Sequence, residues 1–118
     1  LPVSAPFHSS LLKPAGDRLA VALSRVELRS PRFALVNNID AAVESDPARI
    51  RDALVRQSFG PVRWVDVVGA LKARGISHVI EFGPGKVLAG LVSRVDKSLK
   101  VSAVFDPASL ATTLQELG

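Results

Sequence analysis

His8 is the first residue of this sequence whose type and setting favour catalytic chemistry. It follows the extended apolar segment that ends at Phe7 and precedes a predicted helix, so we expect it near the end of a strand. In parallel α/β sheets, ligands bind at the carboxyl ends of strands. An imidazole placed there can take up and return protons near neutral pH. The alternative is a histidine that only makes hydrogen bonds within a loop.

A histidine base needs a nucleophile, and the sequence offers none in a recognisable setting. It has no Gly-x-Ser-x-Gly elbow, and it has no cysteine, which also excludes disulfides and cysteine-type zinc sites. Ser9 and Ser10 follow His8, but we expect one of them to cap the next helix. The sequence therefore predicts that any nucleophile acting with His8 lies outside these residues.

The stretch Gln57-Ser58-Phe59-Gly60-Pro61 predicts a helix end with free carbonyl groups. Proline stops the preceding helix and leaves its last carbonyls without intrahelical partners. Such a carbonyl can accept a hydrogen bond from an imidazole N–H and fix its tautomer, as the carboxylate does in a Ser-His-Asp triad. An ordinary helix end without this role is the simpler interpretation of the pattern alone.

The glycine-rich stretch 81–88 (Glu-Phe-Gly-Pro-Gly-Lys-Val-Leu) leads from a predicted strand into a predicted helix. Backbone N–H groups at such a helix start can bind phosphate. The P-loop spacing is missing, however, because Val87 occupies the place where a hydroxyl is needed. A tight strand-to-helix turn is the alternative. His78, inside the predicted strand, is assigned a structural role.

The elements that position these residues alternate between helices and strands. Helices are predicted over 10–26, 46–57, 64–75, 86–95 and from Asp106 onward, and buried strands over 33–36, 78–82 and 101–105. The polar residues Asn37, Asn38 and Asp40 are expected to open a loop. This order predicts an α/β fold with a mostly parallel sheet covered by helices, formed by one domain or part of one.

The composition and the charge pattern exclude some classes of function. The net charge of +4 comes from basic residues spread along the chain rather than from a tract, and Trp64 is the sole tryptophan, so nucleic-acid binding is not expected. No apolar run reaches the roughly 18–20 residues of a membrane span. The sequence contains no methionine. We therefore expect a piece of a longer protein. Its first residues resemble neither a signal peptide nor a transit peptide, and we expect a cytoplasmic protein.

Five segments together resemble the carboxy-terminal third of the bacterial malonyl-CoA:acyl carrier protein transacylases, and the match covers essentially all 118 residues. In the order in which they occur, these segments are 3–15, 36–38, 50–57, 61–64 and 81–91. The acyltransferase domains of polyketide synthases share the pattern more loosely. The resemblance implies the carboxy-terminal part of the hydrolase-like large subdomain of that three-layer fold, as a single incomplete domain over 1–118.

The resemblance also implies site residues. The family's catalytic histidine falls on His8, and the glutamine whose main-chain carbonyl orients it falls on Gln57. Phe7 aligns with an aromatic position that favours malonyl over α-methyl-branched acyl groups, a selection typically worth about 1–3 kcal/mol. A plain core aromatic is the alternative for Phe7. Malonyl-CoA and the phosphopantetheine of acyl carrier protein are then substrates, and no metal or redox cofactor is implied.

The family's remaining parts are expected to precede Leu1. These are the serine elbow, the oxyanion-hole glutamine, the arginine that binds the malonyl carboxylate, and the ferredoxin-like subdomain. We therefore expect the segment alone to be inactive, with an uncovered sheet edge, and to need that amino-terminal part as a partner. The rival interpretations are a polyketide synthase segment, a non-catalytic phosphate-binding module that uses residues 83–86, and an inert fragment.

Overall fold

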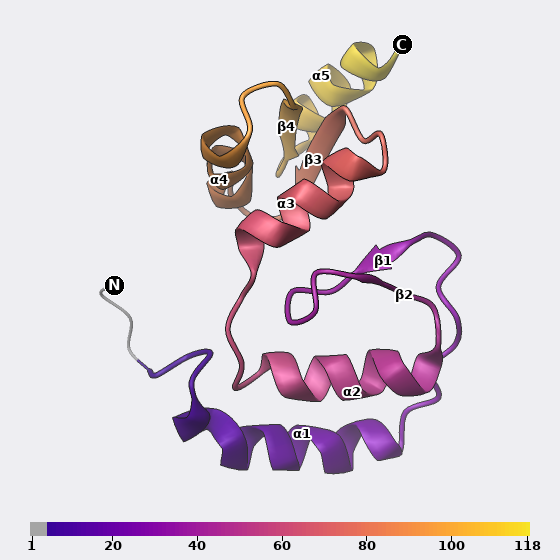
Figure 1. Cartoon of the computed structure of the whole chain (residues 1–118). Coiled ribbons are helices and arrows are strands. Elements are labelled where there is room, and N and C mark those ends of the chain that lie inside the picture. Colours follow the sequence, from indigo (N-terminus) through magenta and orange to yellow (C-terminus); the bar gives the residue numbers. More distant parts are fainter. Residues whose placement is uncertain (1–4) are drawn as a thin grey trace. The chain divides into compact units, whose positions relative to one another are not determined.

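The computed structural model describes residues 5–118, which form two compact units, one extending to Ala70 and the other from Leu71 to Gly118 (Figure 1). Helix α3 (Trp64–Ala73) contains the boundary. The predicted single incomplete domain stays a prediction, and the two units are described separately. None of the helices in the described part of the chain is long and apolar enough to cross a membrane.

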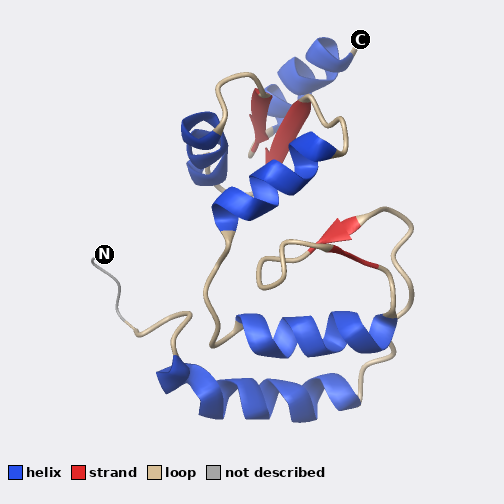
Figure 2. Ribbon diagram, in the orientation of Figure 1, coloured by secondary structure: helices blue, strands red, loops and turns tan. Residues whose placement is uncertain are grey.

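The first unit is built on two helices that lie side by side, α1 (Lys13–Ser24) and α2 (Pro47–Gln57) (Figure 2). A short 3-10 turn over Ser10–Leu12 leads into α1. The helix predicted over 10–26 is therefore present, but the predicted serine cap is wrong. The Ser9 hydroxyl turns back and donates to the Pro6 carbonyl at 2.7 Å, so it is not available to the helix.

Helix α2 begins as predicted. The Asp46 side chain accepts hydrogen bonds from the backbone N–H groups of Ala48 (2.7 Å) and Arg49 (3.4 Å), and Pro47 occupies the first turn, where no N–H is needed. Ile50 and Ala53 are the buried residues of this helix. The cap and the buried face together fix where α2 starts and which side of it packs inward.

Two short antiparallel strands, β1 (Leu35–Val36) and β2 (Val43–Glu44), also belong to the first unit. The prediction of a buried strand over 33–36 is wrong in extent and in burial, since Phe33 is 84% exposed. A turn begins at Asn37, so only two residues pair. The prediction also missed β2, which lies beyond the polar turn and contains one apolar residue, too few to show a strand pattern.

The second unit is a parallel β-α-β arrangement followed by a helix. Strands β3 (His78–Phe82) and β4 (Lys100–Val104) pair in parallel through the crossover helix α4 (Val87–Val95), and α5 (Pro107–Leu117) packs on β4. Gly75 closes α3 with a φ of +79°, as predicted. The α/β class is confirmed. Each strand has one edge without a strand partner in the described part of the chain, as expected.

Candidate active site around His8

The imidazole of His8 is bound to the carboxyl end of α2. Its Nδ1 lies 3.0 Å from the main-chain oxygen of Gln57. A carbonyl oxygen can only accept, so Nδ1 carries the proton and donates it. In the neutral ring this leaves the lone pair on Nε2, which is the form required of a general base. The structure thus brings two of the three predicted site residues together, while their catalytic roles stay predictions.

The backbone of His8 adopts an unusual conformation. Its φ is +56°, in the left-handed region that residues other than glycine rarely occupy. Strain of this kind costs about 1–3 kcal/mol and persists only where surrounding contacts impose it. Two such contacts enclose the residue: Phe7 N donates to Ala5 O at 2.8 Å, and the Ser9 hydroxyl binds Pro6 O. No pattern in the sequence predicts this left-handed turn at His8.

The Gln57 carbonyl is available because of Pro61. In an α-helix, the carbonyl of residue 57 would accept from the N–H of residue 61, and proline has none. The two preceding donors, Phe59 N and Gly60 N, both bind Arg56 O instead, at 3.3 and 2.9 Å. The free carbonyl predicted at this helix end is therefore present, and the imidazole of His8 is its partner.

Close packing between α1 and the end of α2 holds this carbonyl in place. Gly16 is buried, and a Cβ added to it would lie 2.6 Å from Cδ1 of Phe59 and 3.0 Å from Oγ of Ser58. The Lys13 ammonium lies 5.3 Å from the centre of the Phe59 ring, within cation–π range. A residue larger than glycine at position 16 would push the helix end away from α1.

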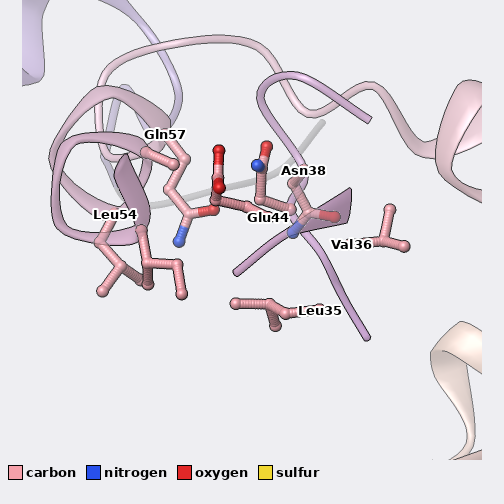
Figure 3. A pocket seen from close by; sticks show the side chains of 9 residues that line it. Leu35, Val36, Asn38, Glu44, Leu54 and Gln57 are labelled. Atoms are coloured by element: carbon pink, nitrogen blue, oxygen red, sulfur yellow. The ribbon is translucent and has the colours of Figure 1, made fainter. Parts of the chain in front are cut away.

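A cavity of about 320 Å³ lies beside the His8 imidazole. Its polar lining comes from His8, Asn38, Gln57 and Ser58, and its apolar lining from Leu19, Leu23 and Leu54. A second cavity of about 210 Å³ shares Asn38, Leu54 and Gln57 with it (Figure 3). Asn38 lies in one of the matching segments, but the sequence alone predicts no role for it. Apolar walls combined with a small number of polar groups are typical of small-molecule sites.

Phe7 precedes His8 and is 57% exposed. It is not among the residues that line the two cavities of the first unit in the described part of the chain. Its role in selecting the acyl group stays a prediction.

The glycine-rich stretch makes a strand-to-helix turn that is filled by the chain's own carboxylate. Glu81 Oε2 accepts the backbone N–H of Ala89 at 2.7 Å, at the start of α4. Because this carboxylate already accepts an N–H group at the helix start, the geometry favours the tight turn over the phosphate site. His78 binds the Ser102 hydroxyl through Nε2 at 2.7 Å, and Ser102 donates to Glu116 at 2.5 Å, a linkage between β3, β4 and α5.

Charged groups surround the end of α2 on its outer side. Arg56 binds Asp40 through both guanidinium Nη atoms and binds Asp52 through Nε. The hydrogen bond from Arg56 holds the pKa of the Asp40 carboxyl below its usual value. Together the two carboxylates raise the pKa of Arg56 further above its already high value.

No protein-family model matches the chain, but individual relatives match almost all of it. It is 47% identical to the malonyl CoA-acyl carrier protein transacylase of Salmonella typhimurium over 116 residues, and 39% identical to that of Bacillus subtilis over 117. These matches cover 98% and 99% of this chain, but 38% and 37% of the relatives. The chain therefore spans little more than a third of the length of the curated relatives it matches.

Solved structures give the same result. An acyl-carrier-protein S-malonyltransferase from Burkholderia pseudomallei is 61% identical, with a TM-score of 0.92, over 98% of this chain and 38% of that one. A malonyl-transacylase solved in complex with a type II polyketide synthase acyl-carrier protein is 46% identical, with a TM-score of 0.92 and the same coverage. The matched part corresponds to the carboxy-terminal segment of these proteins.

Proposed function

We propose that this chain, which belongs to the malonyl CoA-acyl carrier protein transacylase family, supplies the histidine half of a malonyl-transfer site. The reaction moves a malonyl group from coenzyme A to the phosphopantetheine thiol of acyl carrier protein, in fatty acid biosynthesis. The observation that carries the proposal is the hydrogen bond from His8 Nδ1 to the Gln57 carbonyl. It leaves Nε2 ready to accept a proton from a nucleophile supplied by the family's amino-terminal part.

The first half-reaction loads the enzyme. His8 Nε2 takes the proton of the serine hydroxyl while the serine oxygen attacks the thioester carbonyl. The carbon–sulfur bond then breaks, coenzyme A leaves as a thiolate, and the imidazolium returns the proton to its sulfur. The products are a malonyl-serine ester and free coenzyme A.

The second half-reaction runs the same steps with another thiol. His8 takes the proton of the phosphopantetheine thiol, the sulfur attacks the ester carbonyl, and the serine oxygen regains the proton as the bond to it breaks. The Gln57 carbonyl stabilises the imidazolium in both halves, because a hydrogen bond to a charged donor is about twice as strong as a neutral one. Acid–base and covalent catalysis suffice for both halves, so we propose that the reaction uses no metal or redox cofactor.

Two finer features belong to this proposal. Phe7 would crowd the α-carbon of the acyl group and favour malonyl over branched substrates. The net charge of +4 would suit an acidic carrier protein and the phosphates of coenzyme A in the cytoplasm.

A polyketide carrier is the alternative destination of the malonyl group. It is favoured by the relative that was solved in complex with a type II polyketide synthase carrier protein. Transfer rates to the two kinds of carrier protein, measured side by side, distinguish these destinations.

The test of the proposed function uses a chimera in which this chain replaces the matching segment of the Salmonella relative. Transfer of labelled malonyl from malonyl-CoA to acyl carrier protein is followed with His8 intact, with His8→Ala, and with His78→Gln. We expect His8→Ala to lower kcat by orders of magnitude, since a positioned general base contributes about 10²–10⁴-fold. His78→Gln, which changes the chain's other histidine, should leave turnover near that of the parent. Equal rates in the parent chimera and in His8→Ala would refute the proposal.

A further inference from the structure

The turn over residues 37–41, within the loop between β1 and β2, has a defined shape of its own. The Asn37 side chain accepts the backbone N–H of Asp40 at 2.7 Å, and Ala41 N donates to Asn37 O at 3.1 Å. Ala41 has a φ of +53°, a second left-handed backbone in a residue other than glycine. This turn directs Asp40 toward the end of α2. We call residues 37–41 the hairpin loop.

The hairpin loop is bound to the last turn of α2 by a bidentate ion pair. Arg56 Nη1 and Nη2 lie 2.9 and 2.7 Å from the two carboxylate oxygens of Asp40. Arg56 immediately precedes Gln57, and its own carbonyl binds the N–H groups that follow the helix. Paired parallel hydrogen bonds of this kind fix direction as well as distance. The orientation of the last helical turn is therefore tied to Asp40.

The chain beyond Pro61 binds the same loop. Arg63 N donates to Asn38 O at 2.9 Å, and the Arg63 Nη1 donates to the Asp40 carbonyl at 3.2 Å. The loop also packs tightly between these two attachments, since a Cβ added to Gly60 would lie 2.4 Å from Cδ1 of Ile39. The segment from 56 to 63, which contains the Gln57 carbonyl, is thus held at both ends by the hairpin loop.

We infer that Asp40 is a positioning residue for His8. Its carboxylate binds Arg56 before the free helix end, and its main-chain carbonyl binds Arg63 after it. Through these contacts Asp40 fixes the carbonyl of Gln57 to which the imidazole is bound. The inference rests on the proposed function, because it assigns Asp40 a part in that reaction. Asp40 acts through Gln57 and need not touch substrate. Its side chain is 42% exposed, and exposed ion pairs add little to folding stability, so its removal should leave the fold intact.

Asp52 provides a matched control. It also binds Arg56, through Nε at 2.5 Å, but it lies four residues earlier on α2 itself. The Asp52–Arg56 pair therefore stays within the helix and does not reach the hairpin loop. Asp40→Asn and Asp52→Asn each remove one negative charge from the same arginine, and only the first loosens the attachment of the helix end.

The experiment compares Asp40→Asn and Asp52→Asn in the chimera defined above. Two quantities are measured: kcat and KM for malonyl transfer, and the fraction of neutral His8 protonated on Nδ1, from ¹⁵N NMR of the labelled ring. We expect Asp40→Asn to lower kcat about tenfold with KM unchanged, short of the roughly 10²-fold that a 1 Å misplacement can cost. The Nδ1-protonated fraction should fall as well. Asp52→Asn should change kcat by less than about twofold, as is usual for surface substitutions.

A second variant keeps the inference testable if Asp40→Asn fails to fold. Arg56→Lys retains the charge but loses the fork that binds both oxygens of Asp40, so kcat and the tautomer fraction should move in the same direction. Unchanged values for both quantities in Asp40→Asn, or equal losses in the two asparagine variants, would overturn the inference. The tautomer readout needs no turnover, so it separates this failure from a failure of the proposed function.

Discussion

Replacing Pro61 with alanine tests whether the missing N–H of this proline is what leaves the Gln57 carbonyl free to bind His8. Alanine brings a backbone N–H to the one position from which α2 could satisfy the carbonyl of Gln57. Gly60 N already binds Arg56 O in the helical manner at 2.9 Å, so one more residue of helix places the new donor on the Gln57 oxygen. That donor then competes with His8 Nδ1, which lies 3.0 Å from the same oxygen.

The size of the effect follows from the hydrogen bond that is lost. A hydrogen bond to a charged group contributes about 1.5–3 kcal/mol, and the imidazole is charged when it has taken the nucleophile's proton. His8 is exposed in the described part of the chain, so water can replace the carbonyl, and the lower figure applies. At about 1.36 kcal/mol per tenfold, kcat should fall about tenfold. KM should stay unchanged, because the hydrogen bond gains this extra strength only when the imidazole becomes charged in the transition state.

The assay is steady-state malonyl transfer by the chimera, with Pro107→Ala as the control. Pro107 occupies the first turn of α5, in the second unit, and its replacement gives the unfolded chain a similar gain in freedom, about 0.4–1 kcal/mol. Both variants should therefore lose similar thermal stability, but only Pro61→Ala should lose activity. Parallel losses of activity in the two variants, or full activity in Pro61→Ala, would contradict the reasoning.

Two further predictions concern Phe7 and Asp96. Phe7→Ala should shift the ratio of kcat/KM for malonyl over methylmalonyl transfer toward the branched substrate by roughly 10–200-fold. Phe33→Ala, at an exposed loop position, should leave this ratio unchanged. An unchanged ratio in both variants would contradict the role of Phe7 in selecting the acyl group. Hydrogen bonds from Lys72 first, and then from Ser98, lower the Asp96 pKa from 3.8 to about 2. The stability from this pair is therefore present above pH 3.8 and lost as the pH falls through about 2. ¹³C NMR titration of the Asp96 carboxyl should show that midpoint, and Lys72→Met should raise it; equal midpoints would contradict the assignment.

The elements that sequence predicted well are those with strong local signals. Asp46-Pro47 marked the start of α2, and the segment His78–Phe82, rich in β-branched and aromatic residues, marked β3 to the residue. The apolar run from Phe33 predicts burial, but burial depends on which other residues cover the side chain. Burial is set by tertiary neighbours, and the first unit covers Phe33 poorly.

The same division applies to the candidate site. The free helix end was predictable because proline's missing N–H is a local property. The left-handed backbone of His8 was not, since nothing in the preceding residues requires it. The tie from Asp40 to Arg56 was equally invisible, because 16 residues separate the partners and exposed charges pair in many ways. The acceptor, the Gln57 carbonyl, could thus be predicted from the sequence. The contacts that direct the donor, His8 Nδ1, toward it could be seen only in the structure.

In the described part of the chain, the contacts that orient the imidazole come from residues of the first unit. His8 and its acceptor, the proline that frees the acceptor, and the charged residues that hold the helix end all lie between residues 5 and 63. A base that is already oriented loses less conformational freedom when it meets its nucleophile, and such prior ordering is a large part of what an active site contributes to rate. The His8 tautomer should therefore be the same before and after malonyl is loaded onto the serine, and ¹⁵N spectra of the free and loaded chimera compare the two states directly.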